Sequence, residues 1–178
     1  MLPLVFLADT PTLLAGSGPA FDKRRTLLEG AGIRHLTVAH GRPDVTLLQG
    51  QRLVFGAGLP SECAEWLAAA ARARGITVNI EDVPHLCDVH VPALVRRGDL
   101  LLTVSTGGRA PALAAALRAR LESAFGPEWE TRLDELAAQR QRLRSAGARP
   151  AEVIDALGAQ IDEAGWLGAA RALGTRGA

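Results

Sequence analysis

Two apolar runs, each followed by polar residues, constrain the fold of this chain most strongly. Ile76–Ile80 and Leu100–Ser105 are rich in β-branched residues and leucine, so we expect two buried strands. Asp82 comes just after the first run, and the segment Thr106–Gly108 comes just after the second. Because ligands of an open parallel sheet bind at the carboxyl ends of its strands, both groups are candidates for one cleft.

Strand-like runs alternate with helical patterns through the first part of the chain. Residues 11–15, 35–39, 45–48 and 53–57 are typical of strands, and residues 19–29 and 60–74 are typical of helices. This alternation predicts an α/β fold with a Rossmann-like parallel sheet and right-handed crossovers.

Three more helices are expected after the strands, over residues 111–125, 127–145 and 151–164. In the first of them, Leu113, Leu117 and Leu121 mark the expected inner face. In the second, Trp129, Leu133, Leu136, Arg140 and Leu143 follow one another four and three apart, a coiled-coil-like spacing that favours a homodimer.

Composition argues against several classes of partner. The net charge is +1, and the 20 basic and 19 acidic residues are intermixed, so we expect no nucleic-acid partner. No apolar run reaches the roughly 18 residues that cross a bilayer, so we expect no membrane span. The apolar start contains Asp9 and no basic segment, unlike a signal peptide. Cys63 and Cys87 show no disulfide or metal spacing, which suits the cytoplasm.

A glycine turn follows the first expected strand. Strand, glycine turn and helix start together offer backbone N–H groups to a pyrophosphate. Phe21 replaces the third glycine of the dinucleotide pattern, so an ordinary turn between strand and helix is the alternative. The candidate cofactor-binding residues are Gly16, Ser17, Gly18, Pro19, Ala20, Arg42 and Pro43.

The end of the second expected strand lacks the acidic residue that usually holds a nicotinamide dinucleotide by its ribose. His40, Gly41 and Arg42 stand there instead. Arg42 is therefore a candidate partner for a phosphate, and a solvated loop arginine is the alternative.

The loop after Ile80 carries several reactive side chains. Asp82 is a candidate proton acceptor, or else it caps a turn through its carboxylate. His85, Cys87 and His90 are nitrogen and sulfur ligands at compact spacing. Strand geometry would point them to alternate sides, so we predict no permanent metal site.

The segment after Val104 is a candidate for holding an acidic substrate. Successive backbone N–H groups at a helix start bind anions, and arginine binds carboxylates through two parallel hydrogen bonds. Ser105 has no neighbouring base in the sequence, so we do not expect a nucleophilic serine. The candidate substrate-binding residues are Arg96, Arg97, Ser105, Thr106, Gly107, Gly108 and Arg109.

Taken together, these segments resemble the precorrin-2 dehydrogenase/sirohydrochlorin ferrochelatase family, the siroheme synthase module that occurs alone or fused to a methyltransferase. The resemblance is carried by the segments Gly16–Gly18, Lys23–Arg24, Ala73–Asn79, Asp82–Asp88 and Val104–Ala114. It is weak between His40 and Ser61, where the chain is shorter than the family pattern and Gly58-Leu59-Pro60 replaces Thr-Asp-Asp.

The resemblance implies an NAD-binding Rossmann-like domain over residues 1–110, then a dimerisation and small helical domain over residues 111–178. It implies a homodimer that oxidises the tetrapyrrole precorrin-2 to sirohydrochlorin with NAD, and that inserts Fe²⁺ as a substrate to give siroheme. The family's catalytic aspartate matches Asp82, as proton acceptor in both steps, and its phosphorylatable serine matches Thr106. A chelatase that has lost NAD use and a non-catalytic tetrapyrrole-binding protein remain alternatives.

Overall fold

The computed structural model of the protein describes residues 5–168. The chain divides into two compact units, unit 1 over residues 1–91 and unit 2 over residues 92–178. The domain boundary expected after residue 110 falls inside unit 2, because the residues just before it form a hairpin with that unit. The boundary between an NAD-binding domain and a dimerisation domain after residue 110 stays a prediction.

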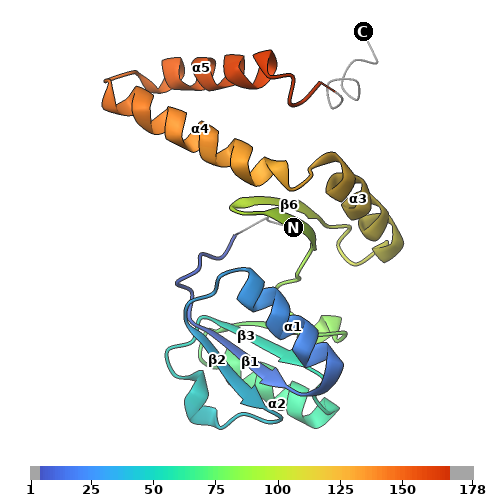
Figure 1. The fold of residues 1–178 in the computed structure, drawn as a ribbon. Coiled ribbons are helices and arrows are strands. Elements are labelled where there is room, and N and C mark those ends of the chain that lie inside the picture. The colour runs from blue at the N-terminus through green and yellow to red at the C-terminus, as the bar shows by residue number, and fades with distance from the viewer. Residues whose placement is uncertain (1–4, 169–178) are drawn as a thin grey trace. The chain divides into compact units, whose positions relative to one another are not determined.

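Unit 1 is built on a four-stranded parallel sheet (Figure 1). Its strands are β1 (Thr12–Gly16), β2 (Leu36–His40), β3 (Leu53–Ala57) and β4 (Thr77–Ile80). They lie in the order β2-β1-β3-β4, and every neighbouring pair is parallel. The predicted Rossmann-like sheet is confirmed, and all four strands end at one edge.

Two helices cover the two faces of this sheet. Helix α1 (Gly18–Gly30) packs Phe21 and Leu28 against one face, with Leu14 of β1. Helix α2 (Ser61–Arg72) packs Leu67 and its buried alanines against the other face, with Leu13 of β1. Because successive side chains of a strand point to opposite faces, the pair Leu13 and Leu14 fills both cores. The two helices expected over residues 19–29 and 60–74 are confirmed, with small shifts of their ends.

Residues 45–48 do not form the strand that the sequence predicted. They form the short 3-10 helix η1 (Val45–Leu48). The carboxylate of Asp44 accepts a hydrogen bond from the Thr46 N–H at 2.8 Å, which caps this turn, and Leu48 is buried in the core. The local cap and the burial of Leu48 outweigh the β preference of valine and threonine.

The run Leu100–Ser105 was predicted to be a buried strand of the parallel sheet, and this is wrong. Strand β6 (Leu100–Val104) pairs antiparallel with β5 (Ala93–Arg97) in a separate two-stranded sheet. Gly98 at φ 54° lies in the two-residue turn that joins them, a connection that no parallel pair can use. The polar groups that follow β4 and β6 therefore do not share one sheet edge.

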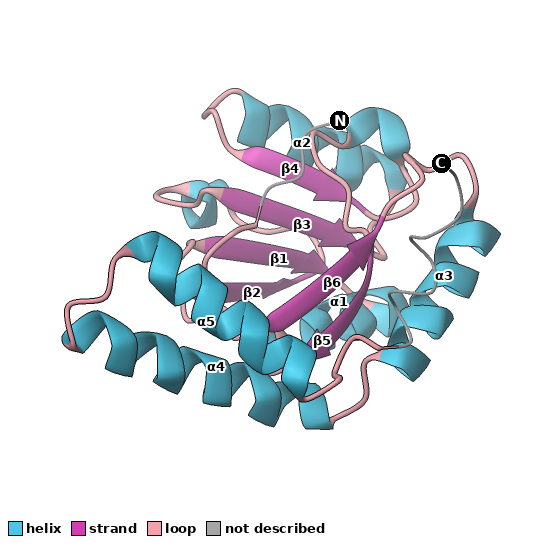
Figure 2. Ribbon diagram, turned by 90° about the horizontal axis from the view of Figure 1, so that it is seen from above, coloured by secondary structure: helices cyan, strands magenta, loops and turns pink. Residues whose placement is uncertain are grey.

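Three helices complete unit 2: α3 (Pro111–Ala124), α4 (Glu128–Ser145) and α5 (Pro150–Glu163). Helices α4 and α5 lie side by side (Figure 2), and Val153 of α5 is buried. The inner face predicted for α3 is not covered, since Leu113 is 52% exposed and Leu117 43%. Within the described residues, no helix is long and apolar enough to cross a membrane.

Candidate functional site

The turn between β1 and α1 requires glycine for steric reasons. Gly16 has φ 145°, and a Cβ there would overlap the carbonyl oxygen of Ala57 at the end of β3. Gly58, just after β3, has φ 64°, and a Cβ there would overlap the carbonyl oxygen of Ser17. The Ser17 N–H donates to the Ala57 carbonyl at 3.2 Å. The ends of two neighbouring strands are thus in backbone contact, at the point where α1 and α2 leave for opposite faces.

The amino end of α1 is open to a ligand. Ser17 is the N-cap but makes no side-chain cap, and the first turn carries no acidic residue. Ser17, Gly18 and Pro19 are exposed, and a Cβ on Gly18 would meet nothing within 4 Å. Free N–H groups and the positive end of the helix dipole fit a phosphate or pyrophosphate. The residues present therefore fit a dinucleotide.

The end of β2 lies beside this turn. The Gly41 N–H donates to the Gly16 carbonyl at 2.8 Å, and the His40 ring lies 5.1 Å from the Phe21 ring. Arg42 is exposed, with its guanidinium carbon 4.2 Å from the centroid of Trp66. Pro43 is buried, as is Gly16, so these two residues of the predicted cofactor set offer little side-chain surface to a ligand.

Asp82 lies at the same edge of the sheet, just after β4. The ends of β1 and β4 are separated only by β3, which corresponds to about 10 Å across two strand spacings. Asp82 has φ 62°, the one positive φ of a non-glycine residue in the described part of the chain. Its side chain is exposed, and no residue within 5–168 gives its carboxylate a hydrogen bond or ion pair. The carboxylate is thus free to act on a ligand at this edge.

Glu81, the residue before Asp82, is paired with a residue of helix α1. Its Oε2 lies 3.7 Å from Nη2 of Arg24 in α1, and both side chains are largely covered. The Arg24 guanidinium also lies 5.1 Å from the centroid of the Phe55 ring. The Glu81 N–H donates to the Gly56 carbonyl at 2.8 Å. These contacts fix the residue that precedes Asp82.

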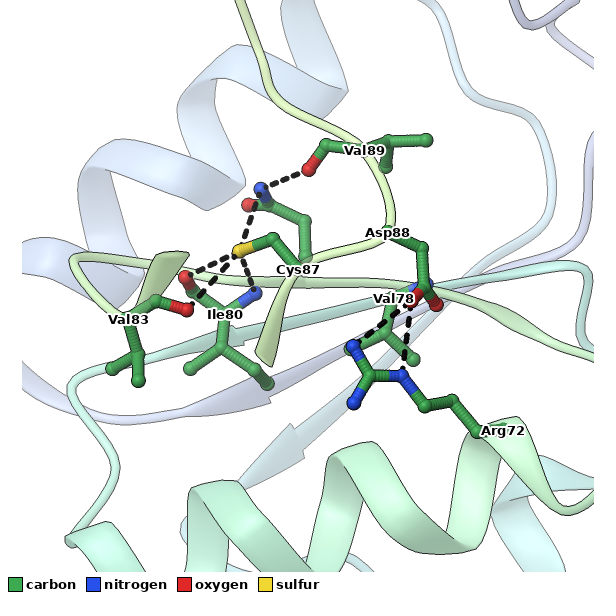
Figure 3. Close-up of polar contacts among 8 residues, drawn as sticks. Arg72, Val78, Ile80, Val83, Cys87, Asp88 and Val89 are labelled. Carbon is green, nitrogen blue, oxygen red and sulfur yellow. Dashed lines mark hydrogen bonds and ion pairs between the residues drawn. The ribbon is translucent and has the colours of Figure 1, made fainter. Parts of the chain in front are cut away.

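The loop after Asp82 turns back along β4, as Figure 3 shows. The Cys87 sulfur lies 3.1 Å from the Ile80 carbonyl oxygen and 3.3 Å from its nitrogen. The Asp88 carboxylate accepts hydrogen bonds from the Val78 N–H at 3.1 Å and from Arg72 at 2.9 Å. Cys87 and Asp88 therefore anchor the loop to the backbone and to α2.

Buried Asn79 is a positioning residue that the sequence analysis did not single out. Its Nδ2 donates to the Val89 carbonyl at 2.8 Å, so it holds the loop against β4. The available signal was an amide side chain between the apolar residues Val78 and Ile80 of the strand, since buried polar groups need partners. His85 and His90 are exposed while Cys87 turns to the backbone, and among residues 5–168 no three metal-ligating side chains gather.

The predicted substrate residues all lie in unit 2. Arg97 donates to the carbonyl of Phe125 at 2.9 Å and to that of Arg96 at 2.8 Å, so it caps the end of α3. Ser105 Oγ accepts from the Gly107 N–H and Thr106 Oγ1 from the Ala110 N–H, both at 3.2 Å. Side chains of this turn therefore accept hydrogen bonds from some of its own backbone N–H groups. Of the remaining candidates, Arg96 is half-buried, and Gly107, Gly108 and Arg109 are exposed.

Comparison with known families matches both units. Residues 8–93 match a family described as "Putative NAD(P)-binding", and residues 97–124 match one described as "Sirohaem biosynthesis protein central". The first match contains the glycine turn and Asp82, and the second begins at Arg97.

Individual relatives agree with these matches. Siroheme synthase of Methylococcus capsulatus is 34% identical over 164 residues, covering 81% of this chain and 34% of the relative. Siroheme synthase of Nitrosomonas europaea is 40% identical over 119 residues, covering 66% of this chain and 24% of the relative. This chain thus spans about a third of the length of the curated relatives it matches.

A solved structure shares the fold over nearly the whole length. It is described as "SirC, precorrin-2 dehydrogenase" and superposes with a TM-score of 0.75. The superposition covers 94% of this chain and 92% of the other, at 16% sequence identity. At that identity the likeness establishes the fold.

Proposed function

The chain belongs to the siroheme synthase family, and we propose that it oxidises precorrin-2 to sirohydrochlorin. The proposed hydride acceptor is a nicotinamide dinucleotide, which the family resemblance identifies as NAD. The support from the structure is the edge of the parallel sheet, where an open helix start and an unpaired carboxylate occur together.

The backbone of the glycine turn would hold the dinucleotide. Gly16 brings the chain close to the end of β3, and Gly18 leaves the start of α1 open. The N–H groups there would bind the pyrophosphate. When bound, the dinucleotide supplies the acceptor for the hydride.

Asp82 would take the proton that accompanies hydride loss from the tetrapyrrole. The observation that carries this proposal is its exposed carboxylate, held without a partner on a backbone at φ 62°. Left-handed backbone is less costly for aspartate than for most residues, yet it still indicates a position that the surrounding contacts hold. Glu81, paired with Arg24, and Asn79, which holds the loop at Val89, supply those contacts.

Iron insertion is the second proposed step, with Fe²⁺ as a substrate. Insertion of a divalent metal displaces two pyrrole N–H protons, and a carboxylate without a partner can accept them in turn. The exposure of Asp82 favours this use of the same group. A chelatase that has lost dinucleotide use is the alternative.

Unit 2 would bind the substrate periphery and a second copy of the chain. Arg109 is exposed and Arg96 half-exposed, so both have donors for tetrapyrrole carboxylates, whereas Arg97 is engaged at the end of α3. The exposed Leu113 and Leu117 supply an apolar face for a homodimer. We propose the cytoplasm as the location, which suits two cysteines that are both free.

A coupled assay tests the proposal. Precorrin-2 is generated in situ and mixed with the full chain, with and without dinucleotide, and sirohydrochlorin is followed by its absorbance. We expect product only when dinucleotide is present. Product formation that ignores dinucleotide, or none under any condition, would overturn the oxidation step. Metal incorporation from added Fe²⁺ and purified sirohydrochlorin tests the chelatase step separately.

A further inference from the structure

A cation stands where the ribose of a nicotinamide dinucleotide would be held. In folds of this type, a carboxylate at the end of the second strand binds the ribose hydroxyls, and an arginine there accommodates a 2′-phosphate. Strand β2 ends at His40 and is followed by Gly41 and Arg42. The hydrogen bond from the Gly41 N–H to the Gly16 carbonyl, at 2.8 Å, fixes this end of β2 beside the glycine turn.

The first carboxylate after β2 is already engaged. Asp44 Oδ1 accepts hydrogen bonds from the Thr46 hydroxyl at 2.6 Å and from the Thr46 N–H at 2.8 Å. Both bonds lower the pKa of Asp44 below its usual value, and the bond from the Thr46 hydroxyl has the larger effect. Asp44 thus caps η1, and it is not turned toward a ribose.

Arg42 is held in place but keeps its donors. Its guanidinium stacks on Trp66, with 4.2 Å from Cζ to the ring centroid, and Trp66 packs against the core of unit 1. Stacking orients a guanidinium without using its N–H groups. Across residues 5–168, no carboxylate pairs with Arg42.

We infer that Arg42 is the residue that selects the dinucleotide, by binding a 2′-phosphate, so that the chain binds NADP more tightly than NAD. The inference rests on the proposed nucleotide site and changes the cofactor named from the sequence. The absence of a ribose carboxylate removes the contact that would favour NAD, and the oriented arginine adds one that only NADP can make.

Equilibrium binding to the full chain tests this, with NADP⁺ and NAD⁺ titrated separately by calorimetry. For the unmodified chain we expect NADP⁺ to bind about tenfold more tightly or better, as for a charge-assisted hydrogen bond. In Arg42→Ala the preference should vanish, with NAD⁺ affinity changed by less than about twofold, because that substitution removes only the phosphate contact.

Two further variants complete the test. Arg42→Lys should keep part of the preference, because it retains the charge and loses the planar fork. Arg52→Ala is the matched control: Arg52 is equally exposed but precedes β3, at the opposite edge of the sheet. It should leave both affinities unchanged, since it alters the net charge alone.

The outcomes separate this inference from the proposed function. Equal or tighter binding of NAD⁺ by the unmodified chain, or an Arg42→Ala variant that weakens both nucleotides alike, overturns the inference. Oxidation of precorrin-2 with NAD⁺ would then leave the proposed function standing. If neither nucleotide binds, both the inference and the oxidation step are overturned.

Discussion

The two units bury their apolar residues to very different extents. In unit 1, both faces of the parallel sheet are covered, and Leu13, Val54 and Leu67 are fully buried. In the described part of unit 2, the buried hydrophobic residues are Val95 and Val153, and helices α3 and α4 contain none. Since burial of apolar surface is the main favourable term in folding, unit 1 has a core of its own, whereas the described part of unit 2 buries few hydrophobic residues.

The largest effect is expected from the glycine turn that closes the core of unit 1. Gly16→Ala places a Cβ on the Ala57 carbonyl at an unfavourable φ, so we expect unit 1 to lose roughly 3 kcal/mol or more. Urea unfolding followed by circular dichroism measures this. Gly30→Ala is the control, because its added Cβ meets nothing within 4 Å. Equal midpoints for the two variants would contradict the steric account.

The uncovered face of α3 gives the next effect. Leu113→Asp with Leu117→Asp places two charges on the face proposed to meet a second copy, so we expect self-association to weaken by about a hundredfold or more. Sedimentation velocity over a concentration series measures it. Ala115→Asp, on the other flank of α3, is the matched control and should remain dimeric. A monomeric unmodified chain would contradict the proposed homodimer.

A smaller effect is expected where the loop that follows Asp82 joins the core of unit 1. Asn79→Ala removes the donor to the Val89 carbonyl and should cost about 1–3 kcal/mol. The Val89 amide, which donates to Val78, should also exchange faster with solvent. Hydrogen exchange by NMR reads both changes. Thr26→Ala, on the exposed side of α1, should leave exchange at Val89 as it was.

The smallest effect is expected at the start of α5 in unit 2. The Arg149 side chain, and then its backbone N–H, lower the pKa of Glu152. Because the folded pKa lies below the unfolded one, this contact stabilises the helix above the ordinary glutamate pKa and is lost as the pH falls. Arg149→Ala should raise the pKa of Glu152, as read by NMR titration, while Asp155→Asn should not. An unchanged pKa would mean that the exposed pair contributes nothing.

The sequence was sufficient for the parallel sheet because its signals are local. Glycine turns, apolar runs and helix periodicity each follow from neighbouring residues, and α1 and α2 lie where the sequence predicts helices. The position of the strand Leu100–Val104 was also predicted correctly, but its pairing was not: it was expected in the parallel sheet and pairs with β5 instead. Pairing depends on β5, whose sequence Ala93–Arg97 contains two arginines and lacks a clear strand signal.

The site was predictable in its residues but not in its contacts. Asp82 and the glycine turn follow from their positions at strand ends. The pairing of Glu81 with Arg24, the capping of α3 by Arg97 and the stacking of Arg42 on Trp66 join residues distant in the sequence. No periodicity or spacing encodes such contacts, because they depend on how helices and strands pack.

The most direct test of this account separates binding from chemistry at Asp82. Asp82→Asn keeps the shape of an exposed residue that makes no hydrogen bond or ion pair with any described residue, so the fold should be preserved. We expect dinucleotide affinity to stay within about twofold while precorrin-2 oxidation falls about a hundredfold or more, as for loss of a general base. Asp99→Asn, in the β5–β6 turn, should oxidise precorrin-2 at the unmodified rate. Full activity of Asp82→Asn would contradict the account, because the edge of the sheet would then hold the cofactor without performing the reaction.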